Sequence, residues 1–172
     1  MTTKLIEAAV ERGATNPPGR LLIHGEGHWK CVAMAGLWIA ERMPVANADF
    51  ILVFAQLHDM MRVNDGHDPW HGQRAALLYR KLVATRQARE WEAMGFALSF
   101  HQAGFRSEHQ DPNVGICWDA DRVNLWRVSI EPDPALLSTE AGSSREAIEY
   151  GRQLCGRQLA GDLPSWAEIT GP

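Results

Sequence analysis

The feature that most constrains this chain is a set of histidines and aspartates at positions where a helix would bury them. Side chains at i, i+3, i+4 and i+7 share one face of an α-helix. With this spacing the pattern predicts that five helices aim imidazole or carboxylate groups into one core. The groups and their apolar companions are His28 with Val32, Ala35 and Ile39; His58 and Asp59 after the apolar run 50–57; His71 with Ala75, Leu78 and Leu82; His101 with Trp91, Met94 and Leu98; and Asp121 with Val114, Trp118, Leu125 and Val128.

The same periodicity predicts an all-α fold. Residues 50–55 are apolar on every side and would also suit a buried strand, but the apolar pattern continues to Met60, which favours a helix. Strand signals are nearly absent elsewhere. We expect a C-terminal helix that ends near residue 160, preceded by helices at about 3–12, 27–43, 47–61, 68–84, 86–101 and 113–128.

Local signals place several helix ends. Asn47 or Asp49 can cap the helix expected at 47–61. Asp68 followed by Pro69 is typical of a helix start, with the acid as the cap and proline in the first turn. Residues 143–146 contain the serine and glutamate spacing of a capping box, which predicts the start of the C-terminal helix.

Length and composition predict a single globular domain. The chain has 172 residues, of which 45% are apolar and 22% are charged, close to ordinary globular usage. It contains no repeat, low-complexity tract or obvious linker. We therefore expect one helical bundle over residues 1–172, with a core at about 20–130 and a helical extension at about 131–172.

Composition also narrows the classes of function. The net charge of −4 argues against a dedicated nucleic-acid partner. No apolar run approaches the length of a membrane span. The three cysteines are widely spaced, and Glu7 stands where a signal peptide would need its apolar stretch. These features are typical of a cytoplasmic protein in a reducing compartment.

Four histidines and two aspartates on apolar faces are hard to explain as six core residues that are each hydrogen-bonded separately. A lone histidine on such a face is often a hydrogen-bonded core residue, but an unpaired buried carboxylate costs several kcal/mol. Asp121 therefore needs an arginine, several backbone donors or a metal. Asp59 could instead end its helix in solvent, although an acid is unfavourable at a helix C-terminus. Together the groups predict a site for one or two divalent ions of the Mn, Fe, Co, Ni or Zn type.

The two acids Asp119 and Asp121 cannot face the same side, because they are two residues apart on one predicted helix. Asp121 is the one on the apolar face, so we expect it to be the ligand. We expect Asp119 to be exposed or to support the ligands from behind.

The ordered set His28, His58-Asp59 and Asp121 resembles the H…HD…D signature of the HD-domain superfamily of metal-dependent phosphohydrolases. The context is also similar: His28-Trp29 opens a predicted helix, an apolar segment leads into His58-Asp59, and Asp121 lies within Asp-Ala-Asp-Arg. The segment 71–76 resembles the one that follows the HD pair in many members. The resemblance covers about residues 20–130 and lacks the Gly-Tyr-Pro run of the cyclic di-GMP hydrolases.

The resemblance implies an all-α bundle with a metal at its centre. The first ion would be held by His28, His58, Asp59 and Asp121. In members with two metals the HD aspartate bridges and further histidines hold the second ion. His71 and His101 fit those places, with His67 in the following turn as a substitute for His71.

The resemblance further implies an enzyme that hydrolyses a phosphoric ester with metal-activated water. The substrate would be a small phosphorylated metabolite or a nucleotide. Arg62, Lys30 and Arg122 are candidates to bind the phosphate, and His24 is a candidate to line the pocket or protonate the leaving group. Each of these could instead be a surface charge or a loop residue.

Two other functions fit the same residues. One is a di-iron oxygenase of the superfamily, similar to myo-inositol oxygenase, which uses a comparable set of four histidines and two aspartates. The other is an HD-type binding module without catalysis. In the C-terminal region, Trp166 and the prolines at 132 and 134 are expected either to close over the bundle or to form a homodimer contact.

Overall fold

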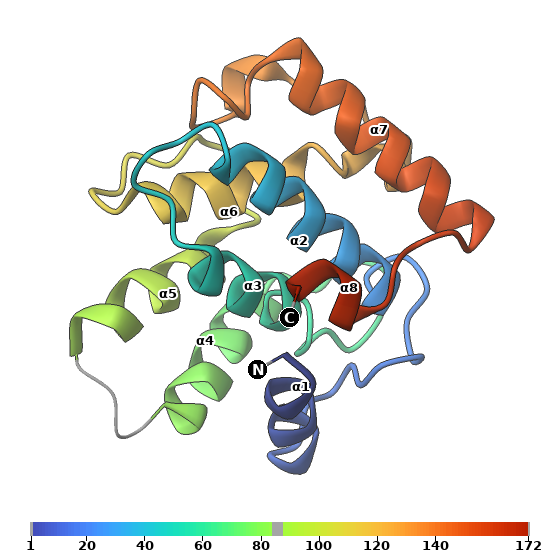
Figure 1. Cartoon of the computed structure of the whole chain (residues 1–172). Coiled ribbons are helices and arrows are strands. Elements are labelled where there is room, and N and C mark those ends of the chain that lie inside the picture. Colours follow the sequence, from blue (N-terminus) through green and yellow to red (C-terminus); the bar gives the residue numbers. More distant parts are fainter. Residues whose placement is uncertain (1, 84–87, 172) are drawn as a thin grey trace.

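The computed structural model describes residues 2–83 and 88–171, and in these residues it is all-helical, as predicted, with no strand. The connections between helices run over the surface of one bundle (Figure 1). The elements are α1 (Thr2–Glu11), α2 (Glu26–Ala40), α3 (Ala48–Leu57), α4 (His71–Leu82), α5 (Ala88–Phe100), α6 (Pro112–Arg122), the 3₁₀ helices η1 (Leu125–Val128) and η2 (Pro134–Leu136), α7 (Arg145–Ala160) and α8 (Trp166–Thr170).

The core is built around α2, which runs through the middle of the bundle and contacts α3, α6 and α7 (Figure 1). Most of its side chains are buried on every side, including Trp29, Val32 and Ile39. Helix α3 crosses it closely, since a methyl group added at Gly36 would collide with the side chain of Ile51. This close approach brings the start of α2 and the end of α3 to the same region of the core.

Helices α4 and α5 form an antiparallel pair beside α3 (Figure 1). The predicted end of the fourth helix at Ala84 and the predicted start of the fifth at Arg86 lie outside the described residues. So does the side chain of Trp91, which the sequence pattern places beside His101. The described parts of the pair bring the first turn of α4 against the last turn of α5.

Several helices end earlier than predicted, and these ends carry the candidate site. Helix α3 ends at Leu57, so His58 caps it and Asp59 follows in a turn. Helix α2 ends at Ala40 rather than at Met43. The helix predicted at 113–128 is divided, because α6 ends at Arg122 and the chain continues as η1.

One predicted helix start is wrong, and a second helix starts where predicted but with a different cap. Helix α4 begins at His71, because the Asp68 carboxylate accepts hydrogen bonds from the Val63 N–H and from Arg74 instead of capping a helix. Helix α7 is capped by Ser144 without a capping box, since its side chain accepts from the Ala147 N–H. Of the alternative caps for α3, Asn47 is the one observed.

The C-terminal region closes over the bundle. Helix α7 lies along α2, and α8 returns to the start of α2 (Figure 1). Trp166 is buried, and its indole N–H donates to the Glu26 carboxylate over 3.1 Å. A capping box that the sequence analysis did not identify starts α8, with Ser165 and Glu168 bonding each other's backbone N–H groups.

Candidate metal centre

The six predicted ligand-type residues come together in the interior of the bundle. They arrive from the first turn of α2, the end of α3, the start of α4, the residue after α5 and the last turn of α6. All are buried, with exposed fractions of 8% or less. They are His28, His58, Asp59, His71, His101 and Asp121.

The first group lies between α2, α3 and α6. The Nε2 atoms of His28 and His58 are 3.1 Å apart. An Asp121 oxygen, Oδ1, lies 3.1 Å from His28 Nε2. The Oδ2 atom of Asp59 lies 3.5 Å from His58 Nε2 and 3.8 Å from His28 Nε2. The ligand atoms of His28, His58 and Asp59 lie close enough together to hold one ion, and Asp121 lies beside them, next to His28.

The second group lies between α4 and α5. The Nε2 atoms of His71 and His101 are 2.8 Å apart. The other oxygen of Asp59, Oδ1, lies 3.1 Å from His71 Nε2 and 3.9 Å from His101 Nε2. One carboxylate therefore faces two groups of histidines, one with each oxygen, which is the arrangement of a bridging ligand.

Hydrogen bonds to the backbone fix the tautomer of three of the histidines. The Nδ1 atoms of His58, His71 and His101 lie 3.0, 2.6 and 2.8 Å from the carbonyl oxygens of Ala55, Asp68 and Leu98, each three residues earlier in the chain. A carbonyl oxygen can only accept, so each Nδ1 must carry the proton. In the neutral ring Nε2 then holds a lone pair.

This tautomer shows that the site fits a cation. His71 and His101 present two lone pairs and Asp59 presents a carboxylate oxygen, and these acceptors face one another without a proton to share. Asp59 Oδ2 is buried with no hydrogen-bond donor among the described residues. Converging acceptors repel unless a cation lies between them. Nitrogen and carboxylate ligands of this kind suit divalent transition metals.

Burial favours the ionisation states that a metal needs. It lowers the pKa of His28 to about 3 and that of His58 to about 4, so both rings are neutral at pH 7. Burial acts in the opposite direction on Asp59, but the surrounding imidazoles, His58 foremost, hold the pKa of its carboxyl well below the usual range. For Asp121, burial is likewise outweighed by the hydrogen bond with His28 and the charge of Arg127, so its pKa is also well below the usual range.

Two arginines contact the two aspartates. Arg62 Nε donates to Asp59 Oδ1 over 2.8 Å, and Arg127 Nη2 lies 3.4 Å from Asp121 Oδ1. Arg127 was not among the predicted site residues. Six residues separate it from Asp121, which is not a same-face spacing on an α-helix. The change from α6 to the 3₁₀ helix η1 brings it back to the site.

The two groups open into a cavity of about 220 Å³. Of the four predicted substrate residues, His24, Arg62 and Arg122 line it and Lys30 does not. Lys30 pairs with Glu26 on the same helix, 3.4 Å away, and lies outside the lining of this cavity. The cavity is lined by His24, Asp59, Arg62, His71, His101, Gln102, Ala103, Asp121, Arg122, Leu125, Arg127 and Val128.

The guanidinium of Arg122 has a structural role. It donates to the backbone carbonyls of Leu136, Ala103 and Phe105, and it lies over the ring of Trp118, with its Cζ atom 5.1 Å from the ring centroid. These bonds hold the loop after α5 against η2. The side chain lines the cavity, but its guanidinium N–H groups already donate to backbone oxygens.

His24 is held by an acid that the sequence analysis did not identify. Its Nδ1 lies 3.1 Å from Asp65 Oδ1, and its backbone N–H donates to the same oxygen. Burial lowers the pKa of His24, so the ring is mostly neutral at pH 7. With Nδ1–H directed to Asp65, its Nε2 carries the lone pair that can accept a proton.

Asp119 differs from both predicted roles. It is fully buried, and its carboxylate accepts from the backbone N–H groups of Ser138 and Thr139 and from the Thr139 hydroxyl. Asp119 therefore fastens the segment after η2 to α6 rather than supporting a ligand. His67 is exposed in its turn, which leaves His71 as the histidine of the second group.

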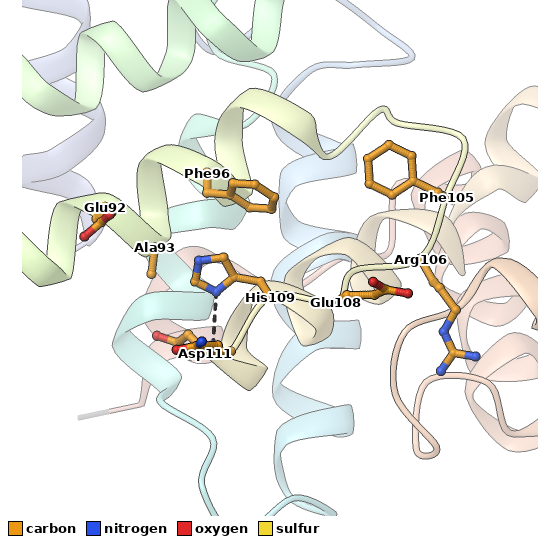
Figure 2. A pocket seen from close by; sticks show the side chains of 9 residues that line it. Glu92, Ala93, Phe96, Phe105, Arg106, Glu108, His109 and Asp111 are labelled. Carbon is orange, nitrogen blue, oxygen red and sulfur yellow. Dashed lines mark hydrogen bonds between the residues drawn. The ribbon is translucent and has the colours of Figure 1, made fainter.

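A larger cavity, of about 1040 Å³, lies away from the cluster along α5 and the loop that follows it (Figure 2). Its wall includes Phe96, Phe105 and Arg106. His109 also lines it, but its Nδ1 accepts from the Asp111 N–H over 3.0 Å, which fixes the loop before α6 (Figure 2). None of the six clustered residues lines this cavity.

None of the helices in residues 2–83 and 88–171 combines the length and apolar character needed to cross a membrane. The function must be argued from the geometry of the buried cluster. Comparison with known proteins gives no family model, no curated protein and no solved structure that matches this chain.

Proposed function

We propose that this chain is a metal-dependent phosphohydrolase of the HD-domain type, acting on a small phosphorylated molecule. The observation that supports it is the meeting of lone pairs at His71 Nε2 and His101 Nε2 with Asp59 Oδ1, a buried oxygen to which Arg62 alone donates among the described residues. On the other side, the Nε2 lone pair of His58 faces Asp59 Oδ2, which has no donor among the described residues. Two cations bridged by Asp59 would relieve both conflicts.

When bound, divalent cations would supply a water of lowered pKa and neutralise charge on a phosphate. His28, His58 and Asp121 would hold one ion, His71 and His101 the other, and Asp59 both. Mn, Fe, Co, Ni and Zn all suit these ligands. The two-ion arrangement is common in enzymes that cleave phosphoric esters.

The other residues of the cavity have roles in the same reaction. In hydrolysis, water oxygen bonds to phosphorus, the ester P–O bond breaks, and a proton from the water reaches the departing oxygen. His24 is suited to move that proton, because Asp65 holds its Nδ1–H and leaves Nε2 free to accept. Positive side chains in the cavity wall would bind the phosphate.

The test measures phosphate release from a panel of phosphoric esters. The protein is first treated with a chelator to remove metal and is then reloaded with each of the five metals in turn. We expect turnover with at least one metal and a loss of more than about 100-fold in Asp59→Asn, since a bridging ligand orients both ions. His67→Ala is the matched control, because His67 is exposed, and it should retain wild-type activity.

A di-iron oxygenase is the alternative outcome of this experiment. The cluster of four histidines and two aspartates suits iron equally well. Iron-loaded protein that consumes oxygen, with no phosphate released under any of the five metals, would replace the hydrolase by an oxygenase.

A further inference from the structure

The wall of the cavity above the cluster contains three arginines. They differ in how many of their guanidinium N–H groups already donate to a protein acceptor. Arg122 gives its donors to three backbone carbonyls. Arg62 and Arg127 each hold an aspartate of the cluster and keep further N–H groups that find no acceptor in residues 2–83 and 88–171. These two arginines enter from different elements, the turn after α3 and the 3₁₀ helix η1.

Arg127 is the more informative of the two. Its side chain is only 9% exposed. Nη1 donates to the Asn124 carbonyl, and Nη2 makes one long contact of 3.4 Å with Asp121. Nε is buried and has no partner among the described residues. Nε–H and Nη2–H form one edge of a guanidinium, so the edge that binds oxyanions in bidentate fashion is nearly unused.

Arg62 also has an N–H group that no described residue accepts. Its Nε donates to Asp59 and its Nη1 to the Gly66 carbonyl over 3.0 Å, while Nη2 has no acceptor among the described residues. The buried Nε of Arg127, which lacks an acceptor, costs free energy that an oxygen of a ligand would recover. The unused N–H groups of the two arginines therefore point to an oxyanion in the cavity.

We propose that Arg127 and Arg62 together bind the terminal phosphate of a phosphate monoester, and that this selects monoesters over diesters. This inference rests on the proposed function for the reaction, but the anion site itself depends only on the arginines. A monoester has three unesterified oxygens and a charge near −2, whereas a diester has two such oxygens and one charge. Only the monoester can meet cations on one side and a bidentate arginine edge on the other.

The small volume of the cavity agrees with this substrate class. At about 220 Å³ it is smaller than the about 300–1,000 Å³ of pockets that enclose a drug-sized ligand. The enclosed part of the substrate is therefore little more than the phosphate with a short organic body.

The experiment measures inorganic phosphate binding by titration calorimetry, with and without Mn²⁺, and compares turnover of p-nitrophenyl phosphate and bis(p-nitrophenyl) phosphate. Arg127→Lys keeps the charge and removes the bidentate edge, so we expect its Kd for phosphate to rise about tenfold. Arg62→Lys should also raise the Kd for phosphate, and it replaces Arg127→Lys as the test variant if that protein does not fold. Arg106→Lys, exposed and outside this cavity, is the control and should bind phosphate as wild type does.

The possible results separate the two proposals. Equal phosphate affinity in wild type and the folded lysine variants would overturn the inference, and so would faster turnover of the diester than of the monoester. Phosphate binding that depends on Arg127 without turnover of either ester would overturn the hydrolase and leave the anion site supported. Preferential monoester turnover, reduced in Arg127→Lys and unchanged in Arg106→Lys, supports both.

Discussion

At the scale of single residues, the chemistry of the site follows from which atom of each histidine carries the proton. His58, His71 and His101 each donate Nδ1–H to a carbonyl three residues earlier, so the backbone just before each histidine sets its tautomer. His28 is the exception, because its Nδ1 is buried with no partner among the described residues. Three rings are thus held with Nε2 directed into the candidate metal site.

The same burial predicts a pH dependence for the metal-free protein. The pKa of His28 falls to about 3 and that of His58 to about 4, from 6.5 in an exposed ring. The unfolded chain therefore takes up protons first as the pH falls, so stability is full above pH 6.5 and is lost below it. By pH 5 each ring should remove about 2 kcal/mol from the free energy of unfolding.

Urea denaturation of chelator-treated protein between pH 7.5 and pH 5 measures this effect. His28→Gln should show a shallower loss than wild type, because one of the two imidazoles no longer titrates. His67→Gln, at an exposed position, should follow the wild type. A stability that is flat from pH 7.5 to pH 5 would show that the two rings are not buried and neutral.

Residue identity on an apolar face was enough to predict the six clustered side chains, but not their supporting contacts. Asp121 was expected to face inward and does, while Asp119 was expected to be exposed or to support the ligands and is instead buried against the segment after η2. Periodicity gives one inward face for each helix. It cannot show that the segment 138–139 covers the other face of α6 and binds Asp119 through its backbone.

At the scale of helices, the site depends on how closely α4 approaches α5. A methyl group at Gly72 would lie 2.5 Å from the Leu98 carbonyl oxygen and 3.0 Å from that of Ser99. The Leu98 carbonyl is also the acceptor that orients His101. Gly72 is therefore needed to bring His71 and His101 within reach of one ion.

Gly72→Ala should separate α4 from α5 and cost about 1–3 kcal/mol of stability, as overpacking does. It should also weaken the second ion more than the first, because His28 and His58 lie on other helices. Thermal denaturation with and without metal, and metal content per chain, measure the two effects. Gly156→Ala is the control, since the space at this α7 position is open and stability should not fall.

The helices could be predicted because apolar periodicity is a property of each segment. Their ends could not, because they depend on contacts with other segments. Asp68 has the sequence of a cap, yet Arg74 and the Val63 N–H take its carboxylate. The early end of α3 at Leu57 is what allows His58 and Asp59, neighbours in sequence, to reach the same cluster from a turn.

At the scale of the whole molecule, the cluster links parts of the chain that are far apart. Its members range from residue 28 to residue 121, and each of the helices α2 to α6 contributes a residue at or next to one of its ends. Asn16 ties the N-terminal loop to the same region by donating to the carbonyls of His24 and Asp59. A small bundle has one core, so the convergence could be predicted. Arg127 reaches the site through the 3₁₀ helix η1 and Asp65 through a loop, and neither path leaves an α-helical periodicity in the sequence.

The central claim is that the cluster holds two cations bridged by Asp59, and metal content per chain by elemental mass spectrometry tests it most directly. The samples are wild type, His71→Ala, Asp59→Asn and the control His67→Ala, purified without chelator and without an immobilised-metal column. The account predicts about two equivalents in wild type and His67→Ala, about one in His71→Ala and almost none in Asp59→Asn. Wild-type protein without metal that also gains no thermal stability from added Mn, Fe, Co, Ni or Zn, or Asp59→Asn with wild-type metal content, would contradict it.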